Sequence, residues 1–162
     1  MARGPGRQAG GEVRALGFFP PVGDDRLGPT YRDECLRLGH TPGMVMMPSP
    51  KQPGTVVVAE DPDAAWHRHG PYLLHDAVTY HSWQTADVRS SVNSGAATIE
   101  ELRAEGVYRI LTPDEVVALA HELGPLGAVT LHPLCGGTPP ELAWESLELF
   151  GEQVLPRMQA GA

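Results

Sequence analysis

The chain has 162 residues, with 12 basic and 20 acidic side chains and a formal net charge of -8. This length is enough for one domain with a buried core, and the acidic balance excludes a general nucleic-acid-binding surface, which needs basic residues facing phosphates. No apolar run approaches the roughly 20 residues that cross a bilayer. The two cysteines, Cys35 and Cys135, lie far apart and form no CxxC pair, which predicts a reduced, cytoplasmic setting without disulfides.

The N-terminal part predicts two short strands around one helix. Residues 1–12 are rich in Gly and Arg without periodicity, so we expect them to be disordered and not to be a signal peptide. The runs ALGFF at 15–19 and MVMM at 44–47 predict strands, and apolar residues recur at helical spacing between them. Cys35 falls on that helical stripe, and we interpret it as an inert core residue rather than a reactive thiol.

The middle of the chain predicts a buried strand followed by a long helix. The run TVVVA at 55–59 is rich in β-branched residues, which is typical of a strand covered on both faces. Asp61-Pro62 then opens a helix, because Asp is a good N-cap and Pro suits the first helical position. Gly70-Pro71 should kink or split this helix, since proline removes an amide donor and clashes with the preceding turn.

Polar and aromatic residues along this helix raise the question of a site. Four histidines lie here: His67, His69, His75 and His81. His67 and His69 are two residues apart, so on a helix they point to different sides, and we interpret the histidines as exposed or partly buried rather than as zinc ligands. Tyr80, His81 and Trp83 could line a pocket or simply pack, and the polar stretch 85–95 could be a loop over a site or a disordered link.

The C-terminal part predicts two further strands, each followed by a helix. A capping box at Thr98 starts a short helix that ends near Gly106, before the apolar run at 107–111. Thr112-Pro113-Asp114-Glu115 is a second capping box, and the helix that it opens leads to the apolar run AVTL at 128–131. Thr138-Pro139-Pro140-Glu141 repeats the start signal. Two strands joined by one helix should lie parallel, with a right-handed crossover.

These elements predict an α/β fold of about five apolar strands, forming a parallel sheet or part of a barrel. The sequence has no dinucleotide-binding glycine fingerprint, no P-loop and no Gly-x-Ser-x-Gly nucleophile elbow. The loop from His132 to Thr138 follows the last predicted strand, where parallel α/β folds hold their sites. Its Gly136-Gly137 pair could offer backbone amides to a phosphate, or it could be an ordinary flexible turn.

A family resemblance rests on four stretches of the chain: FFPPVGDDRLGPTYRDECLRLGH, VAEDPDAAWHRHGPYLLHDAVTYHSWQ, ELRAEGVYRILTPDEVVALAHELG and LHPLCGGTPPELAWESLELFGEQVLP. Together they resemble the C-terminal part of luciferase-like monooxygenases, which are flavin- or deazaflavin-dependent oxidoreductases built on a TIM barrel. The last stretch is the most specific. The resemblance implies that residues 13–162 form a partial (β/α)8 TIM barrel of about five parallel strands with flanking helices.

The resemblance also implies a chemistry and a set of site residues. Reduced FMN, or the deazaflavin F420, would activate dioxygen to oxygenate a small organic substrate, while the protein positions the cofactor and excludes water. The cofactor would lie against the strand-end loop, and Tyr80, His81 and Trp83 would shape the substrate pocket. The residues implied for the cofactor are His132, Gly136, Gly137 and Thr138. The resemblance points to no catalytic residue and no metal ligand.

The length of the chain leads to an alternative. A TIM barrel takes about 250 residues, so the chain resembles a truncated or split member without its N-terminal half. It could then be a non-catalytic half-barrel that binds a small ligand or a partner chain. In either case we expect it to self-associate or to bind a partner that supplies the missing strands, because open sheet edges expose unpaired backbone groups.

Overall fold

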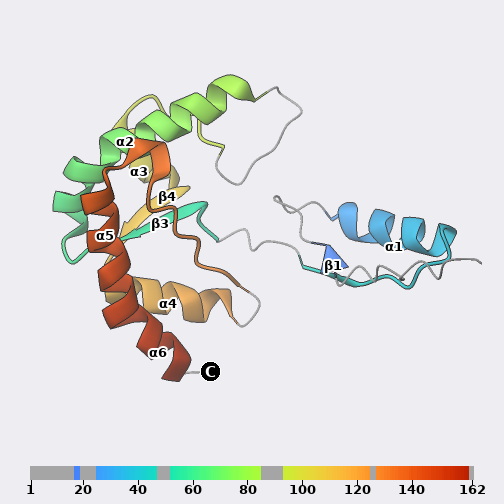
Figure 1. Ribbon diagram of the computed structural model, residues 1–162. Helices are drawn as coiled ribbons and strands as arrows, with labels where there is room; N and C mark the ends of the chain where they lie inside the picture. The colour runs from blue at the N-terminus through green and yellow to red at the C-terminus, as the bar shows by residue number, and fades with distance from the viewer. Residues whose placement is uncertain (1–16, 19–24, 47–51, 85–92, 125–126, 161–162) are drawn as a thin grey trace, which may run out of the picture. The chain divides into compact units, whose positions relative to one another are not determined.

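The computed structural model describes residues 17–18, 25–46, 52–84, 93–124 and 127–160 (Figure 1). The chain divides into two compact units, the first made of Met1–Pro20 with Asp24–Met47 and the second of Pro21–Gly23 with Pro48–Ala162. The segment 1–12, for which the sequence predicts disorder, lies outside the described residues, as does most of the polar stretch 85–95.

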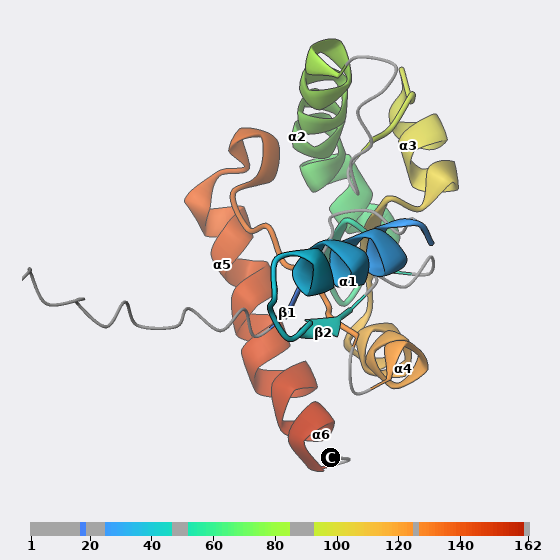
Figure 2. The same ribbon diagram turned by 90° about the vertical axis from the view of Figure 1, so that its right-hand side faces the viewer.

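The first unit is a small βαβ motif (Figure 2). It consists of β1 (Gly17–Phe18), α1 (Leu27–Arg37) and β2 (Met44–Val45). The strands are parallel, with Gly17 opposite Met44. Both strands occur where the sequence predicts them, but each has only two residues. A pair this short contributes little stability by itself.

The second unit is built around the parallel pair β3 (Thr55–Val58) and β4 (Tyr108–Leu111). Helices α2 (Pro62–Trp83) and α3 (Ile99–Glu105) connect the two strands. In both views α5 runs on toward α6, and α4 lies beside α6 (Figures 1 and 2). The elements after β4 are α4 (Pro113–Leu123), the 3-10 turn η1 (Cys135–Gly137), α5 (Pro140–Leu149), the π turn η2 (Phe150–Val154) and α6 (Leu155–Ala160).

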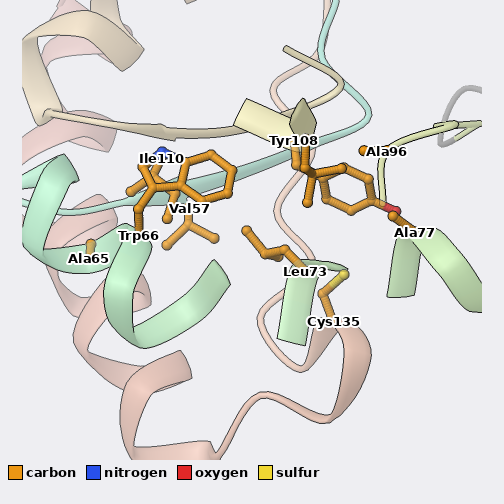
Figure 3. Close-up of a cluster of buried hydrophobic side chains, with 10 residues drawn as sticks. Val57, Ala65, Trp66, Leu73, Ala77, Ala96, Tyr108, Ile110 and Cys135 are labelled. Carbon is orange, nitrogen blue, oxygen red and sulfur yellow. The ribbon is translucent and has the colours of Figure 1, made fainter. Parts of the chain in front are cut away.

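Strand β3 is buried on both faces, as its β-branched sequence predicts. Its alternating side chains enter two separate apolar clusters. Val57 joins the cluster formed with α2, α3, β4 and η1, where Trp66, Leu73 and Tyr108 are the largest members (Figure 3). Val56 and Val58 join the cluster formed with α4 and η2. Helices therefore cover both faces of the strand pair.

Helices α2, α3 and α4 each start at a residue whose side chain caps the helix. Asp61 caps α2, and its carboxylate accepts a hydrogen bond from the amide of Ala64 at 3.0 Å. Helix α4 has the full predicted capping box between Thr112 and Glu115. Helix α2, however, is continuous through Pro71 and is not split. The physical reason is that residues before and after Pro71, such as Trp66 and Leu73, are buried in one cluster, so packing holds the helix together.

Thr112→Ala should lower the free energy of unfolding by about 1 kcal/mol, because the hydroxyl that accepts the Glu115 amide is lost. The shift of the urea midpoint at constant slope measures the effect. An unchanged midpoint would show that the capping box contributes nothing to the stability of α4.

The prediction of a partial (β/α)8 TIM barrel with about five parallel strands is wrong. The described residues contain four strands in two separate two-stranded sheets. The predicted strand at 128–131 is not a strand, although the Val56 amide donates to the Thr130 carbonyl at 2.9 Å. Two residues further along β3, the Val58 amide donates instead to the side chain of Ser146 at 2.8 Å. A side-chain acceptor in this place ends the backbone ladder, so the sheet does not extend toward a barrel.

Among the described residues, no helix combines the length and the apolar character needed to cross a membrane.

Candidate functional site

A cavity of about 340 Å³ lies at the carboxyl end of β3, beside the first turns of α2. The carboxyl ends of parallel strands are where α/β folds place their ligands, and the volume falls within the range of small-molecule sites, near its lower end. Aliphatic and charged side chains share the wall. The residues that line the cavity are Val58, Ala59, Glu60, Asp61, Ala64, Ala65, Arg68, His69, Glu145, Ser146 and Leu149.

His69 and Ser146 are the buried polar residues that line this cavity, and His69 is the one that can titrate. It is only 5% exposed, and its Nδ1 atom has no hydrogen-bond partner in the described part of the chain. Burial lowers the pKa of His69 from its ordinary value of 6.5, and the nearby charge of Arg68 lowers it further, while Glu145 acts in the opposite direction. The imidazole is therefore neutral at pH 7, and one of its two nitrogens is an acceptor.

The lowered pKa of His69 also makes the free energy of unfolding depend on pH. Between the folded-state pKa and 6.5, the unfolded chain binds more protons at this residue than the folded chain. The contribution of His69 is thus fully present above about pH 6.5 and decreases as the pH falls below that value.

Arg68 and Glu145 form an ion pair on the wall of the cavity. The two terminal guanidinium nitrogens of Arg68, Nη1 and Nη2, donate to the Glu145 carboxylate, at 2.7 and 2.8 Å. The hydrogen bonds to Arg68 lower the pKa of Glu145. Both side chains are about half exposed, so the pair contributes little to stability. Its effect on the site is to occupy the guanidinium and to join α2 to α5.

The turn from His132 to Thr138 has a different structure from a phosphate cradle. The amides of Cys135, Gly137 and Thr138 donate to carbonyls within the turn, at 3.0 to 3.1 Å. His132 is exposed, and its carbonyl is one of those acceptors. The Thr138 hydroxyl is buried and donates to the Cys135 carbonyl at 2.7 Å. It does not cap α5, whose N-cap residue is Pro139. A helix therefore begins within the predicted Thr-Pro-Pro-Glu stretch, at Pro140, but the prediction that Thr138 caps it is wrong.

Gly136 packs tightly against α2. It has a left-handed backbone with φ of 59°, and a Cβ atom built on it would lie 1.9 Å from the Tyr72 carbonyl oxygen. Only glycine allows this close approach of two backbones. Gly137 also has a positive φ, of 84°, but a Cβ there would meet nothing within 4 Å. The predicted phosphate-binding glycines therefore include one that faces the helix and one that faces open space.

The predicted substrate-pocket residues Tyr80, His81 and Trp83 lie on the last turn of α2 and are exposed. The rings of Tyr80 and Trp83 meet edge to face with centroids 5.6 Å apart. Neither these three residues nor the His132–Thr138 turn is among those that line the cavity at β3. The structure thus places the two predicted groups apart from the cavity.

A buried polar trio joins the turn, α2 and β4. The Tyr108 hydroxyl donates to the Asp76 carboxylate at 2.7 Å, and burial together with this hydrogen bond raises the pKa of Tyr108. Burial, reinforced by the charge of Asp76, raises the pKa of the Cys135 thiol to about 12. Cys135 packs against Leu73 in the apolar cluster (Figure 3). The trio is therefore structural, because a protonated, buried thiol is a poor nucleophile.

Iodoacetamide at pH 8 should alkylate the half-buried Cys35 well before Cys135 in the folded chain. Burial and the raised pKa both protect Cys135. Peptide mass spectrometry over a time course measures the two rates, and a sample in denaturant is the control in which both react. Equal rates in the folded chain would contradict the assignment of Cys135 to the core.

Sequence reasoning missed the cavity at β3 and the burial of His69. The available signals were the Asp61-Pro62 helix start directly after a buried strand and the position of His69 between Trp66 and Leu73, at helical spacing from both. No sequence pattern near β3 or α2 indicates that Glu145 and Ser146 complete the cavity wall, because these residues lie more than 70 positions further along the chain.

A scan against protein-family models finds no match to this chain, and searches of curated proteins and of solved structures find none either.

Proposed function

We propose that the chain binds a small organic molecule in the cavity at the carboxyl end of β3. The observation that carries the proposal is the buried His69 in the cavity wall, with a nitrogen that lacks a hydrogen-bond partner among the described residues. A buried polar atom without a partner costs about 1–3 kcal/mol. Groups that carry such a cost are found mainly at functional sites.

The other properties of the cavity support the same function. Val58, Ala65 and Leu149 offer apolar contact, while Glu60, Asp61 and Arg68 offer polar groups in the same wall. Ligand sites commonly combine an apolar lining with a few polar groups that fix the orientation of the ligand. The capped start of α2 and the end of β3 supply a rigid frame for these side chains.

Flavin-dependent monooxygenase activity stays a prediction that rests on the resemblance alone. The turn expected to hold the cofactor phosphate does not fit that group, because its amides at Cys135, Gly137 and Thr138 are already bonded within the turn. We therefore assign no step to a flavin. A visible absorption spectrum of the chain purified after incubation with FMN or a deazaflavin tests the prediction, and a bound flavin would support it.

A cytoplasmic location and association with a second chain are also proposals. Both cysteines are free thiols, which supports a reducing compartment. Trp83 and Trp144 are 71% and 61% exposed, and large exposed aromatic side chains are enriched where proteins associate. Sedimentation velocity of the purified chain tests self-association, and a monomer at all concentrations would argue against it.

A cavity-filling variant tests the binding site directly. Ala64 is exposed on α2 and lines the cavity, so Ala64→Trp should fill the space without disturbing the core. The control is Ala104→Trp, at an exposed alanine on α3 that is not among the lining residues. A library of small organic compounds is screened by ligand-detected NMR on the full chain. We expect compounds that bind the parent and Ala104→Trp but not Ala64→Trp. The proposal would be overturned if no compound binds, or if the compounds bind Ala64→Trp as well as they bind the parent.

A further inference from the structure

We infer that the cavity at β3 selects a small organic cation, and specifically an amine with a short apolar substituent. The inference rests on the proposed small-molecule site and names its ligand class. Three carboxylates, Glu60, Asp61 and Glu145, line the cavity, and Arg68 is the one cation among the described lining residues. With His69 neutral, the wall carries an excess of two negative charges (three negative minus one positive).

The positive charge of Arg68 is balanced by Glu145. The guanidinium donates two hydrogen bonds to the Glu145 carboxylate, at 2.7 and 2.8 Å, in bidentate geometry. The carboxylates that remain without a cation in the wall are those of Glu60 and Asp61. Both residues directly precede α2, at the carboxyl end of β3.

The start of α2 does not offer an anion site either. Asp61 already accepts the Ala64 amide at 3.0 Å, and Pro62 has no amide hydrogen. The positive end of a helix is equivalent to about half a unit charge. The full charges of Glu60 and Asp61 exceed it, so the local field favours a cation.

His69 adds no competing positive charge to the wall. Burial lowers the pKa of its imidazole, so a neutral ring leaves the negative excess of the wall intact. Val58, Ala59 and Leu149 can contact an alkyl group. A metal ion is a poorer fit, because the described residues contain no group of three or more His, Cys, Asp or Glu side chains placed to hold one.

The test compares three probes of similar size on the full chain: butylammonium, 1-butanol and butyrate. Affinities come from chemical-shift titrations at low ionic strength. We expect butylammonium to bind about tenfold more tightly than 1-butanol, and butyrate to bind most weakly. Each exposed carboxylate contributes modestly to the binding free energy. Two together account for a factor of about ten in the dissociation constant.

Two matched double variants separate a local effect from the overall charge. Glu60→Gln with Asp61→Asn removes the two carboxylates and keeps a good N-cap residue. Glu100→Gln with Glu152→Gln removes the same charge at exposed positions outside the cavity lining. We expect the first double variant to lower the affinity for butylammonium about tenfold and the affinity for 1-butanol less than twofold. The second double variant should change neither affinity.

The outcomes distinguish this inference from the proposed function. If 1-butanol binds as tightly as butylammonium in the cavity, or if butyrate binds best, the site stands but the amine class is wrong. Equal effects of the two double variants would also overturn the amine class. If no probe binds and the compound library also gives no binder, both the class and the site are wrong.

Discussion

Gly136→Ala is expected to destabilise the chain by about 3 kcal/mol or more. The new Cβ atom would lie 1.9 Å from the Tyr72 carbonyl oxygen, so α2 and the turn must move apart. Overpacking of this kind costs about 1–3 kcal/mol, and a side chain in the left-handed region adds about 1–2 kcal/mol. The urea midpoint measures the loss, and far-ultraviolet circular dichroism shows whether the variant still folds.

Gly137→Ala is the matched control for the close approach. Gly137 also has a positive φ, but its Cβ position is open, so only the backbone strain of about 1 kcal/mol applies. Equal losses in the two variants would mean that Gly136 does not pack against α2. The comparison therefore distinguishes a packed structural turn from a loop left open for a ligand.

Ser146→Ala is expected to lower the free energy of unfolding by about 2 kcal/mol. The Val58 amide donates to the Ser146 hydroxyl at 2.8 Å in the interior, and its loss leaves a buried donor without a partner. Hydrogen exchange should show faster exchange of the Val58 amide, together with a lower urea midpoint.

The control is Ser82→Ala, which removes an exposed hydroxyl that donates to the Thr79 carbonyl on α2. Surface substitutions of this type usually change the free energy of unfolding by no more than about 0.5 kcal/mol. A Val58 amide that remains protected in Ser146→Ala would show that another group, such as the segment near Thr130, can extend the sheet at this position.

The helix starts and the central strand could be predicted from the sequence because their chemistry is local. Asp61, Thr98 and Thr112 each cap a helix through residues three positions away. The run of β-branched residues at 55–59 predicts a strand buried on both faces, and helices cover β3 on both sides.

The barrel could not be excluded from the sequence, because sheet size depends on distant contacts. The apolar run at 128–131 has strand composition, and Val129 and Leu131 do pack against the second core cluster. Its pairing with β3 stops after Val56, because the Val58 amide donates to Ser146 in a later helix. The same limitation applies to the site, since a helix face, a strand end and Glu145 on α5 meet only in the folded chain.

The pKa of His69, followed by NMR, tests the central claim most directly. His67 and His75 lie on the same helix and are exposed, so they serve as internal references. We predict that His69 titrates below 6.5 because it is buried beside Arg68, and that a ligand bound in the cavity shifts the His69 ring signals while those of His67 and His75 stay in place. A His69 pKa at or above 6.5, or His69 ring signals that do not respond to any ligand bound by the chain, would contradict the account.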